Sequence, residues 1–231
     1  MLLQQAEALA ENLALQSPLT AIYSSDLNRA RTTAQRILTG QVKTTSSLIL
    51  HTSELLREQN FGSAEGMKIS TKTPGMTMGA HFAQGIFPAL HSRSQRFPGG
   101  ESLDDMALRA ELVLETILLP HVIQEHKERQ NRRVEKKEVG EEEGNEKMGR
   151  KIAVVSHGLF IGELVRAILN RDKVWTTRRG EQIDVKNLRG MKNTGWTRLE
   201  VTVHPGSKTE GFEVRSPPGR GDRLTSLSLT F

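Results

Sequence analysis

Residues 152–160 read Ile-Ala-Val-Val-Ser-His-Gly-Leu-Phe, and this stretch predicts a buried strand that turns directly into a helix. Residues 152–155 are apolar and rich in β-branched side chains, which favours a strand covered on both faces. Beyond His157-Gly158, apolar residues recur at helical spacing as far as Leu169. Strand–helix units of this kind build parallel sheets, so the stretch indicates an α/β fold.

A second junction of the same kind lies near the start of the chain. Residues 19–23 (Leu-Thr-Ala-Ile-Tyr) predict a short buried strand, and residues 24–26 (Ser-Ser-Asp) can cap a following helix. Arg29 falls in the first turn of that helix. Because parallel strands present their carboxyl ends at one edge of a sheet, where ligands of open α/β sheets bind, we expect Arg29 and His157 to share that edge.

Weaker patterns complete the predicted organisation. Helices are predicted over residues 2–15 and 102–118, and strands over residues 48–50 and 196–203. Ser102, with Asp105 three residues later, forms a capping-box pattern at the start of the second helix. Residues 61–98 are rich in Gly, Thr, Pro and Met without periodicity, so we expect a long excursion or lid there.

Two segments are expected to lie outside the packed fold. Residues 124–151 hold 17 charges in 28 positions, which predicts an inserted helical extension that fades into a disordered loop. Residues 206–231 are expected to form a flexible tail, unpacked from residue 215 onward. The packed domain would therefore cover residues 1–205.

Composition limits the classes of function. The 231 residues contain no cysteine and no apolar run long enough to cross a membrane. A cytoplasmic location is expected, and a nuclear one stays open. The net charge of +5 is matched by residues 171–198, which carry eight basic and three acidic side chains. Such a local excess could attract nucleic acid or a phosphorylated small molecule, but basic residues do not alternate with aromatic ones, which argues against nucleic acid.

Three residue types could carry chemistry at the predicted sheet edge. Arg29 offers a planar fork suited to phosphate, and His157 offers a hydrogen bond or a nucleophilic nitrogen. The free N–H groups of the helix after His157 favour an anion. Taken singly, however, Arg29 could form a surface ion pair, His157 could be structural, and Glu58 could be an ordinary loop carboxylate.

The order of four motifs resembles the histidine phosphatase superfamily, the phosphoglycerate mutase-like proteins, over residues 4–203. The motifs are residues 24–34 (Ser-Ser-Asp-Leu-Asn-Arg-Ala-Arg-Thr-Thr-Ala), 56–66 (Leu-Arg-Glu-Gln-Asn-Phe-Gly-Ser-Ala-Glu-Gly), 98–102 (Pro-Gly-Gly-Glu-Ser) and 154–158 (Val-Val-Ser-His-Gly). The resemblance implies a three-layer fold with a mostly parallel sheet and helices on both faces. It also implies phosphoryl transfer from phosphomonoesters without a metal or other cofactor.

Roles for individual residues follow from the resemblance. Arg29 would clamp the phosphoryl oxygens, His157 would hydrogen-bond them in the transition state, and Glu58 would act as the general acid. Glu101 and Ser102 would sit at the substrate end, although helix capping explains Ser102 equally well. The partner would be a phosphorylated small molecule or a phosphoprotein. The substrate, the oligomeric state and the choice between phosphatase and mutase stay open.

One part of the family pattern is missing. The family's nucleophilic histidine lies in an Arg-His-Gly segment that ends the first strand, and this sequence contains no Arg-His-Gly. Residues 5–9 (Gln-Ala-Glu-Ala-Leu), which match the family helix after that strand, follow Met1 almost at once. We therefore expect the first strand and the nucleophile to be absent, with the true start upstream of Met1 as one explanation. Losing a central strand would leave two neighbouring strands unpaired.

Three functions remain open. The chain could belong to a phosphomonoester hydrolase or mutase and be inactive or impaired as written, because the nucleophile is absent. It could instead be a non-catalytic remnant that binds phosphorylated ligands or a protein partner through Arg29 and His157. A third possibility is a basic interaction protein that uses residues 171–198 and the tail.

Overall fold

The structure is a computed structural model that describes residues 2–15, 18–42, 48–139, 150–170, 198–203, 213–214 and 225–230. Its helices are α1 (Leu2–Ala14), α2 (Asn28–Val42), α3 (Met78–Ala83), α4 (Leu103–Val113), α5 (Leu119–Val139) and α6 (Gly158–Asn170), with short 3-10 helices η1 (Glu54–Leu56) and η2 (Gly62–Ala64) and a π-helical turn η3 (Leu114–Leu118). Its strands are β1 (Ala21–Ser25), β2 (Leu50–Ser53), β3 (Lys151–Val155), β4 (Arg198–Val203), β5 (Glu213–Val214) and β6 (Thr225–Thr230).

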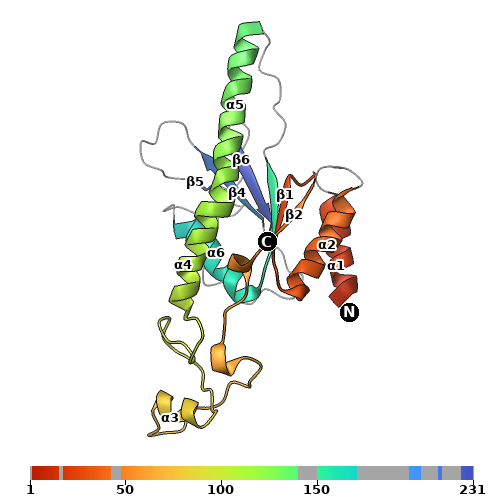
Figure 1. Cartoon of the computed structure of the whole chain (residues 1–231). Helices are drawn as coiled ribbons and strands as arrows, with labels where there is room; N and C mark the ends of the chain where they lie inside the picture. The colour runs from red at the N-terminus through yellow and green to blue at the C-terminus, as the bar shows by residue number, and fades with distance from the viewer. Residues whose placement is uncertain are drawn as a thin grey trace, which may run out of the picture.

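The described strands form one sheet in the order β2-β1-β3-β6-β4-β5. The first four are parallel, whereas β4 runs antiparallel to β6 and β5 runs antiparallel to β4. Helices α1 and α2 lie on one face of the sheet, and α4, α5 and α6 lie on the other (Figure 1). This arrangement confirms the predicted three-layer α/β fold with a mostly parallel sheet.

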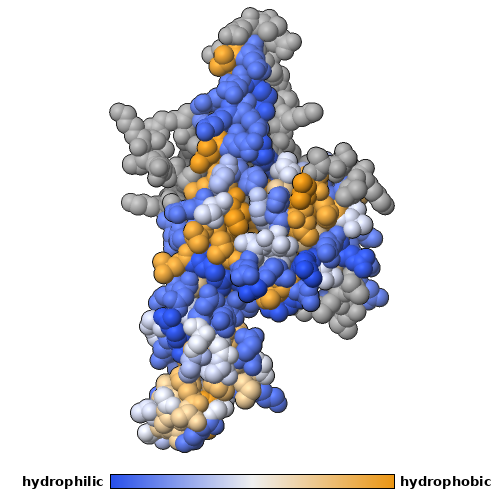
Figure 2. Space-filling view, viewed as in Figure 1, coloured by the Kyte–Doolittle hydropathy of each residue, from blue (hydrophilic) through white to orange (hydrophobic). Residues whose placement is uncertain are grey.

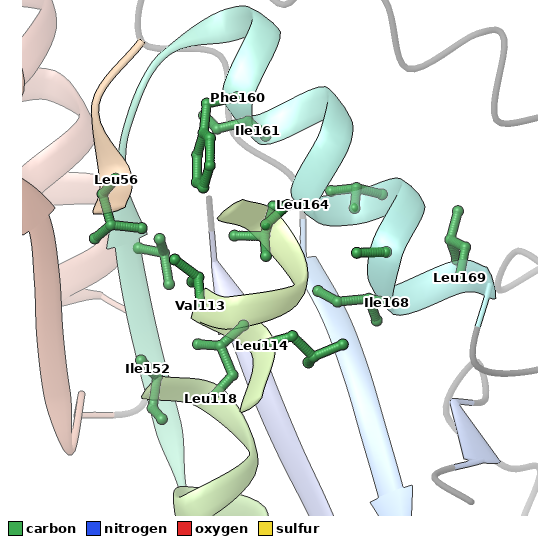
Figure 3. Packing of buried hydrophobic residues seen from close by; sticks show 14 of the residues in the cluster. Leu56, Val113, Leu114, Leu118, Ile152, Phe160, Ile161, Leu164, Ile168 and Leu169 are labelled. Carbon is green, nitrogen blue, oxygen red and sulfur yellow. The ribbon is translucent and has the colours of Figure 1, made fainter. Parts of the chain in front are cut away.

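Alternation along the central strands divides the core between the two faces. Ile22 and Ala153 pack toward α1 and α2, whereas Ile152 and Val154 pack toward α4 and α6. All four are at most 1% exposed. Figure 3 shows the second half of this core, where α6 turns its apolar side toward α4 and η3 and Phe160 points inward from the first turn of α6. The sheet-to-helix turn at His157 is therefore anchored on both sides by buried side chains.

The C-terminal region differs from the flexible tail predicted for residues 206–231. Residues 225–230 form β6, which lies between β3 and β4 with Leu229 opposite both Ile152 and Leu199. The expectation that loss of the family's first strand leaves the neighbouring strands unpaired is wrong for β3, which pairs with β1 and β6. The alternating Thr-Ser-Leu-Ser-Leu-Thr pattern suits a strand, and the paired ladder satisfies the backbone groups of both neighbours.

The excursion predicted at residues 61–98 projects from the carboxyl edge of the sheet and holds η2 and α3 (Figure 1). It has a small core of its own, in which Phe87 and Phe97 pack with Phe82. Its two ends cross at Gly62, whose φ is 54° and where a Cβ would lie 2.3 Å from the carbonyl oxygen of Pro98. Only glycine fits this crossing without strain.

The two highly charged segments are described only in part. The helical extension predicted from residue 124 is confirmed as far as Val139, and the surface along its length is mainly hydrophilic (Figure 2). Residues 140–149 and 171–197 lie outside the described residues, so the predicted loop and most of the basic segment are not described. None of the described helices is both long enough and apolar enough to span a membrane.

The position of β6 predicts how the fold responds to proline. Leu229→Pro removes a ladder N–H inside a strand that is paired on both sides, and should cost about 1–3 kcal/mol of unfolding free energy or more. Thr225→Pro is the matched control, because a proline is tolerated at the first residue of a strand. Thermal melts followed by circular dichroism should show a much larger loss for Leu229→Pro, and equal melting of the two variants would contradict the central position of β6.

Candidate active site

The predicted meeting of the strand ends is confirmed. Strands β1 and β3 are parallel with Ser24 opposite Val155, so β1 and β3 end at the same edge of the sheet. The chain beyond β2 passes through η1 and brings Glu58 to this edge as well. Three side chains from separate parts of the sequence, Arg29, Glu58 and His157, therefore surround the start of α6.

Arg29 and His157 are bonded to each other directly. The Arg29 Nε–H donates to Nδ1 of His157 at 3.0 Å, and Nε2 of His157 lies 2.9 Å from Oγ of Ser25. Because arginine can only donate, Nδ1 must be the acceptor, and the neutral ring carries its proton on Nε2 and donates it to Ser25. The imidazole is thus fixed in one tautomer and one orientation.

The surroundings of His157 favour its neutral form. The ring is almost fully buried, and two arginines, Arg29 and Arg109, lie near it. Burial lowers the pKa of His157 most, and the positive charges of Arg29 and Arg109 lower it further, to about 4. At neutral pH the site therefore holds a neutral imidazole beside an arginine cation.

Glu58 caps the helix that begins after His157. Its carboxylate accepts the backbone N–H of Leu159 at 3.3 Å and that of Phe160 at 3.2 Å. It also accepts the N–H of Gln59 at 3.1 Å. The sequence predicted that the start of this helix would attract an anion, and the anion found there is a side chain of the same protein.

Arg109 was not singled out from the sequence, yet it lies beside the site and contacts the segment that carries Glu58. Its guanidinium, on α4, donates to the carbonyl oxygens of Leu55 at 2.8 Å and Arg57 at 2.7 Å. It also lies over the ring of Phe160, 4.6 Å from the ring centroid. No local signal could have revealed it, because its backbone partners are more than fifty residues away in the sequence.

The two residues predicted at the substrate end are engaged within the protein. Glu101 forms a two-point ion pair with Arg109, at 2.9 and 2.8 Å, and accepts the backbone N–H of Asn60. Ser102 caps α4 in a complete capping box with Asp105, which confirms the capping prediction. Their contact with substrate stays a prediction.

Arg29 differs from the other arginines of the edge. Arg57 is paired with Asp26 at 2.8 Å and holds the pKa of that carboxyl below its ordinary value, and Arg109 is paired with Glu101. Among the described residues, Arg29 forms no ion pair with a carboxylate, so its terminal nitrogens can serve an incoming anion. Within the residues that the structure describes, no three His, Cys, Asp or Glu side chains are grouped so that they could hold a metal ion.

Four other histidines of the described residues have side-chain contacts that do not involve Arg29, Glu58 or His157. His51 stacks on Tyr23, whose hydroxyl lies 2.7 Å from Nε2 of His121. His81 bonds Thr73 and Thr77 within the excursion, and His126 bonds its helix neighbour Gln130. Within the described residues these contacts leave His157 as the histidine bonded to Arg29.

The family model of the histidine phosphatase superfamily (branch 1) matches residues 3–203. The chain belongs to this superfamily. The match confirms the resemblance drawn from the four motifs. No protein with curated function matches the chain significantly.

Solved structures agree with the superfamily fold. A structure described as mycobacterial hydrolase 1 has a TM-score of 0.55 at 25% identity and covers 96% of this chain and 85% of its own. Mycobacterial hydrolase 2 has a TM-score of 0.55 at 23% identity, covering 96% of this chain and 75% of its own. A mycobacterial glucosyl-3-phosphoglycerate phosphatase with VO3 has a TM-score of 0.54 at 23% identity, covering 92% and 82%.

The lowered pKa of His157 predicts a specific pH dependence of stability. The unfolded chain takes up this proton near the ordinary value of 6.5, whereas the folded protein takes it up at about 4. The neutral His157 therefore adds its full contribution to the free energy of unfolding above pH 6.5, and this contribution is lost as the pH falls toward 4. Wild type should lose about 2–3 kcal/mol more than His157→Gln between about pH 7.5 and about pH 4.5, as measured by urea unfolding. Parallel losses in the two proteins would contradict the lowered pKa.

Proposed function

We propose that this edge binds the phosphoryl group of a phosphomonoester, with Arg29 and His157 as its donors and Glu58 as the general acid for the leaving oxygen. The observation that carries the proposal is the Arg29–His157 pair, because its cation has no carboxylate partner among the described residues. Phosphoryl transfer depends on positioning and on neutralising charge on the phosphoryl oxygens, which an arginine and an imidazole can provide.

The neutral state of His157 suits this role. A neutral imidazole with its proton on Nε2 has one N–H to give, now donated to the hydroxyl of Ser25. A phosphoryl oxygen is a stronger acceptor than a hydroxyl, and could compete for that N–H. Arg29 keeps His157 oriented through its Nε, and no described residue bonds its two terminal NH₂ groups, which can serve the same anion.

We further propose that the chain as written turns over phosphomonoesters slowly or not at all. The sequence contains no Arg-His-Gly segment, and both ring nitrogens of His157 are already engaged in hydrogen bonds. Without a covalent nucleophile, only the residual rate enhancement from binding and charge stabilisation remains. The substrate class is a phosphorylated small molecule or a phosphoprotein, and the excursion at residues 61–98, which projects from the same edge of the sheet, could select among them.

Phosphate binding is the first test. Calorimetric titration of the full chain with inorganic phosphate should show binding, and Arg29→Met should weaken it by about tenfold or more, since it removes charge-assisted hydrogen bonds. Arg31→Met is the matched control, because Arg31 lies on the same helix and, within the described residues, its side chain bonds its helix neighbour Asn28 rather than the His157 ring. Absence of binding in wild type, or equal loss in both variants, would contradict the proposed site.

Turnover is the second test. Purified protein should hydrolyse p-nitrophenyl phosphate at a rate close to background, because no nucleophile is available. A rate within tenfold of a typical enzyme value of about 10 s⁻¹, abolished by His157→Ala, would show that the chain is a competent phosphatase and overturn this half of the proposal. Binding without turnover would support the proposal as stated.

A further inference from the structure

We propose that Arg109 is a positioning residue, which holds the carboxylate of Glu58 against the first turn of α6. Arg109 belongs to α4, Glu58 to the segment after η1, and the helix it caps to a third part of the sequence. The side chain of Arg109 is 14% exposed, so it is nearly enclosed by the groups it joins.

All five N–H donors of the guanidinium are used. Nε and one N–H of Nη2 bind the two oxygens of Glu101, and the two N–H groups of Nη1 bind the carbonyls of Leu55 and Arg57. The remaining N–H of Nη2 points to the carbonyl of Glu58 at the longer distance of 3.4 Å. The guanidinium therefore holds the backbone on both sides of Arg57 and reaches the residue that carries the carboxylate.

The same guanidinium also contacts the other side of the Glu58 interaction. It lies over the ring of Phe160, and the backbone N–H of Phe160 is one of the two α6 donors that bind the Glu58 carboxylate. The side chain of Arg109 thus contacts both the segment that carries the Glu58 carboxylate and Phe160, whose backbone N–H donates to that carboxylate. This double contact separates a positioning role for Arg109 from simple support of α4.

Glu101 completes the arrangement by fixing the plane of the guanidinium. Its backbone N–H donates to the carbonyl of Asn60 at 2.7 Å, and its own carbonyl accepts Nε2 of Gln59 at 2.8 Å. The segment that follows Glu58 is therefore fastened to the start of α4 as well. A lysine at position 109 would keep the charge but has only three donors without a planar fork, so it cannot reproduce these contacts.

The position of Glu58 matters for catalysis only if the proposed function is correct, and on that basis Arg109 keeps the general acid beside the Arg29–His157 pair. The contact itself can be measured without any ligand. The amide protons of Leu159 and Phe160 donate to the carboxylate, so their chemical shifts should change when the carboxylate of Glu58 is removed by substitution.

The experiment compares these two amide protons by NMR, in the full chain at neutral pH, where His157 is uncharged. Glu58→Gln should change both chemical shifts, because it removes the charge that the two amides face, and the same substitution is then made in each variant background to measure the amplitude of this change. Arg109→Lys should reduce its amplitude to less than about half, because the charge is kept and the fork is lost. Arg36→Lys is the matched control, since Arg36 forms an ion pair with Glu7 at 3.7 Å on the opposite face, and should leave the amplitude unchanged.

Two results would overturn the proposal. One is a full-amplitude change in folded Arg109→Lys. The other applies if that variant does not fold, in which case Glu101→Gln takes its place, because it removes the carboxylate that orients the guanidinium. Glu101→Gln must then reduce the amplitude, and an unchanged amplitude would refute the role of Arg109. Phosphate binding by the wild type is scored separately, so failure of the proposed function leaves this result interpretable.

Discussion

The parallel pairing of β1 with β3 is the constraint on which the site depends. It sets Ser24 opposite Val155, and this register brings Ser25 within hydrogen-bonding distance of His157. A slip of one residue would turn each side chain of β1 to the other face of the sheet. Ile22 would then leave its apolar layer, and the burial of Ile22 and Ala153 on one face therefore fixes the position of the histidine at the edge.

Among the described residues, the charges at this edge leave Arg29 without a carboxylate partner. Asp26 pairs with Arg57, and Glu101 pairs with Arg109. Glu58 lies against the positive end of the α6 dipole. Among the described residues, Arg29 is the arginine of this edge whose partner is a neutral ring, so an anion entering the site meets a cation that no carboxylate already neutralises.

The parts of this structure that the sequence predicts are local. The strand before His157 and the capping box at Ser102 depend on residues only a few positions apart, and both are found where expected. Strand β1 begins and ends two residues later than the strand predicted over residues 19–23. The prediction ended too early because Ser24 and Ser25 are residue types that often cap a helix. In the folded chain both are fully buried, and their hydroxyls bond a backbone carbonyl and His157.

What could not be predicted depends on distant backbone groups. The partners of Arg109 include main-chain carbonyls, which every residue type carries, so no pattern of side chains points to them. The same holds for β6, whose alternation is visible in the sequence although its neighbours in the sheet are not. Both features were missed because hydrogen bonds to the main chain leave no compositional trace.

The place of β6 in the sheet also bears on how the chain reaches its folded state. β3 ends at Val155 and β6 begins at Thr225, so a strand inside the sheet arrives some seventy residues after its neighbour. During synthesis, the edge of β3 that β6 later covers emerges well before its partner and stays open to other strands in the meantime. Contacts so distant in sequence slow folding, and a nascent chain of this kind gains most from a chaperone that shields exposed strand edges until the sheet closes.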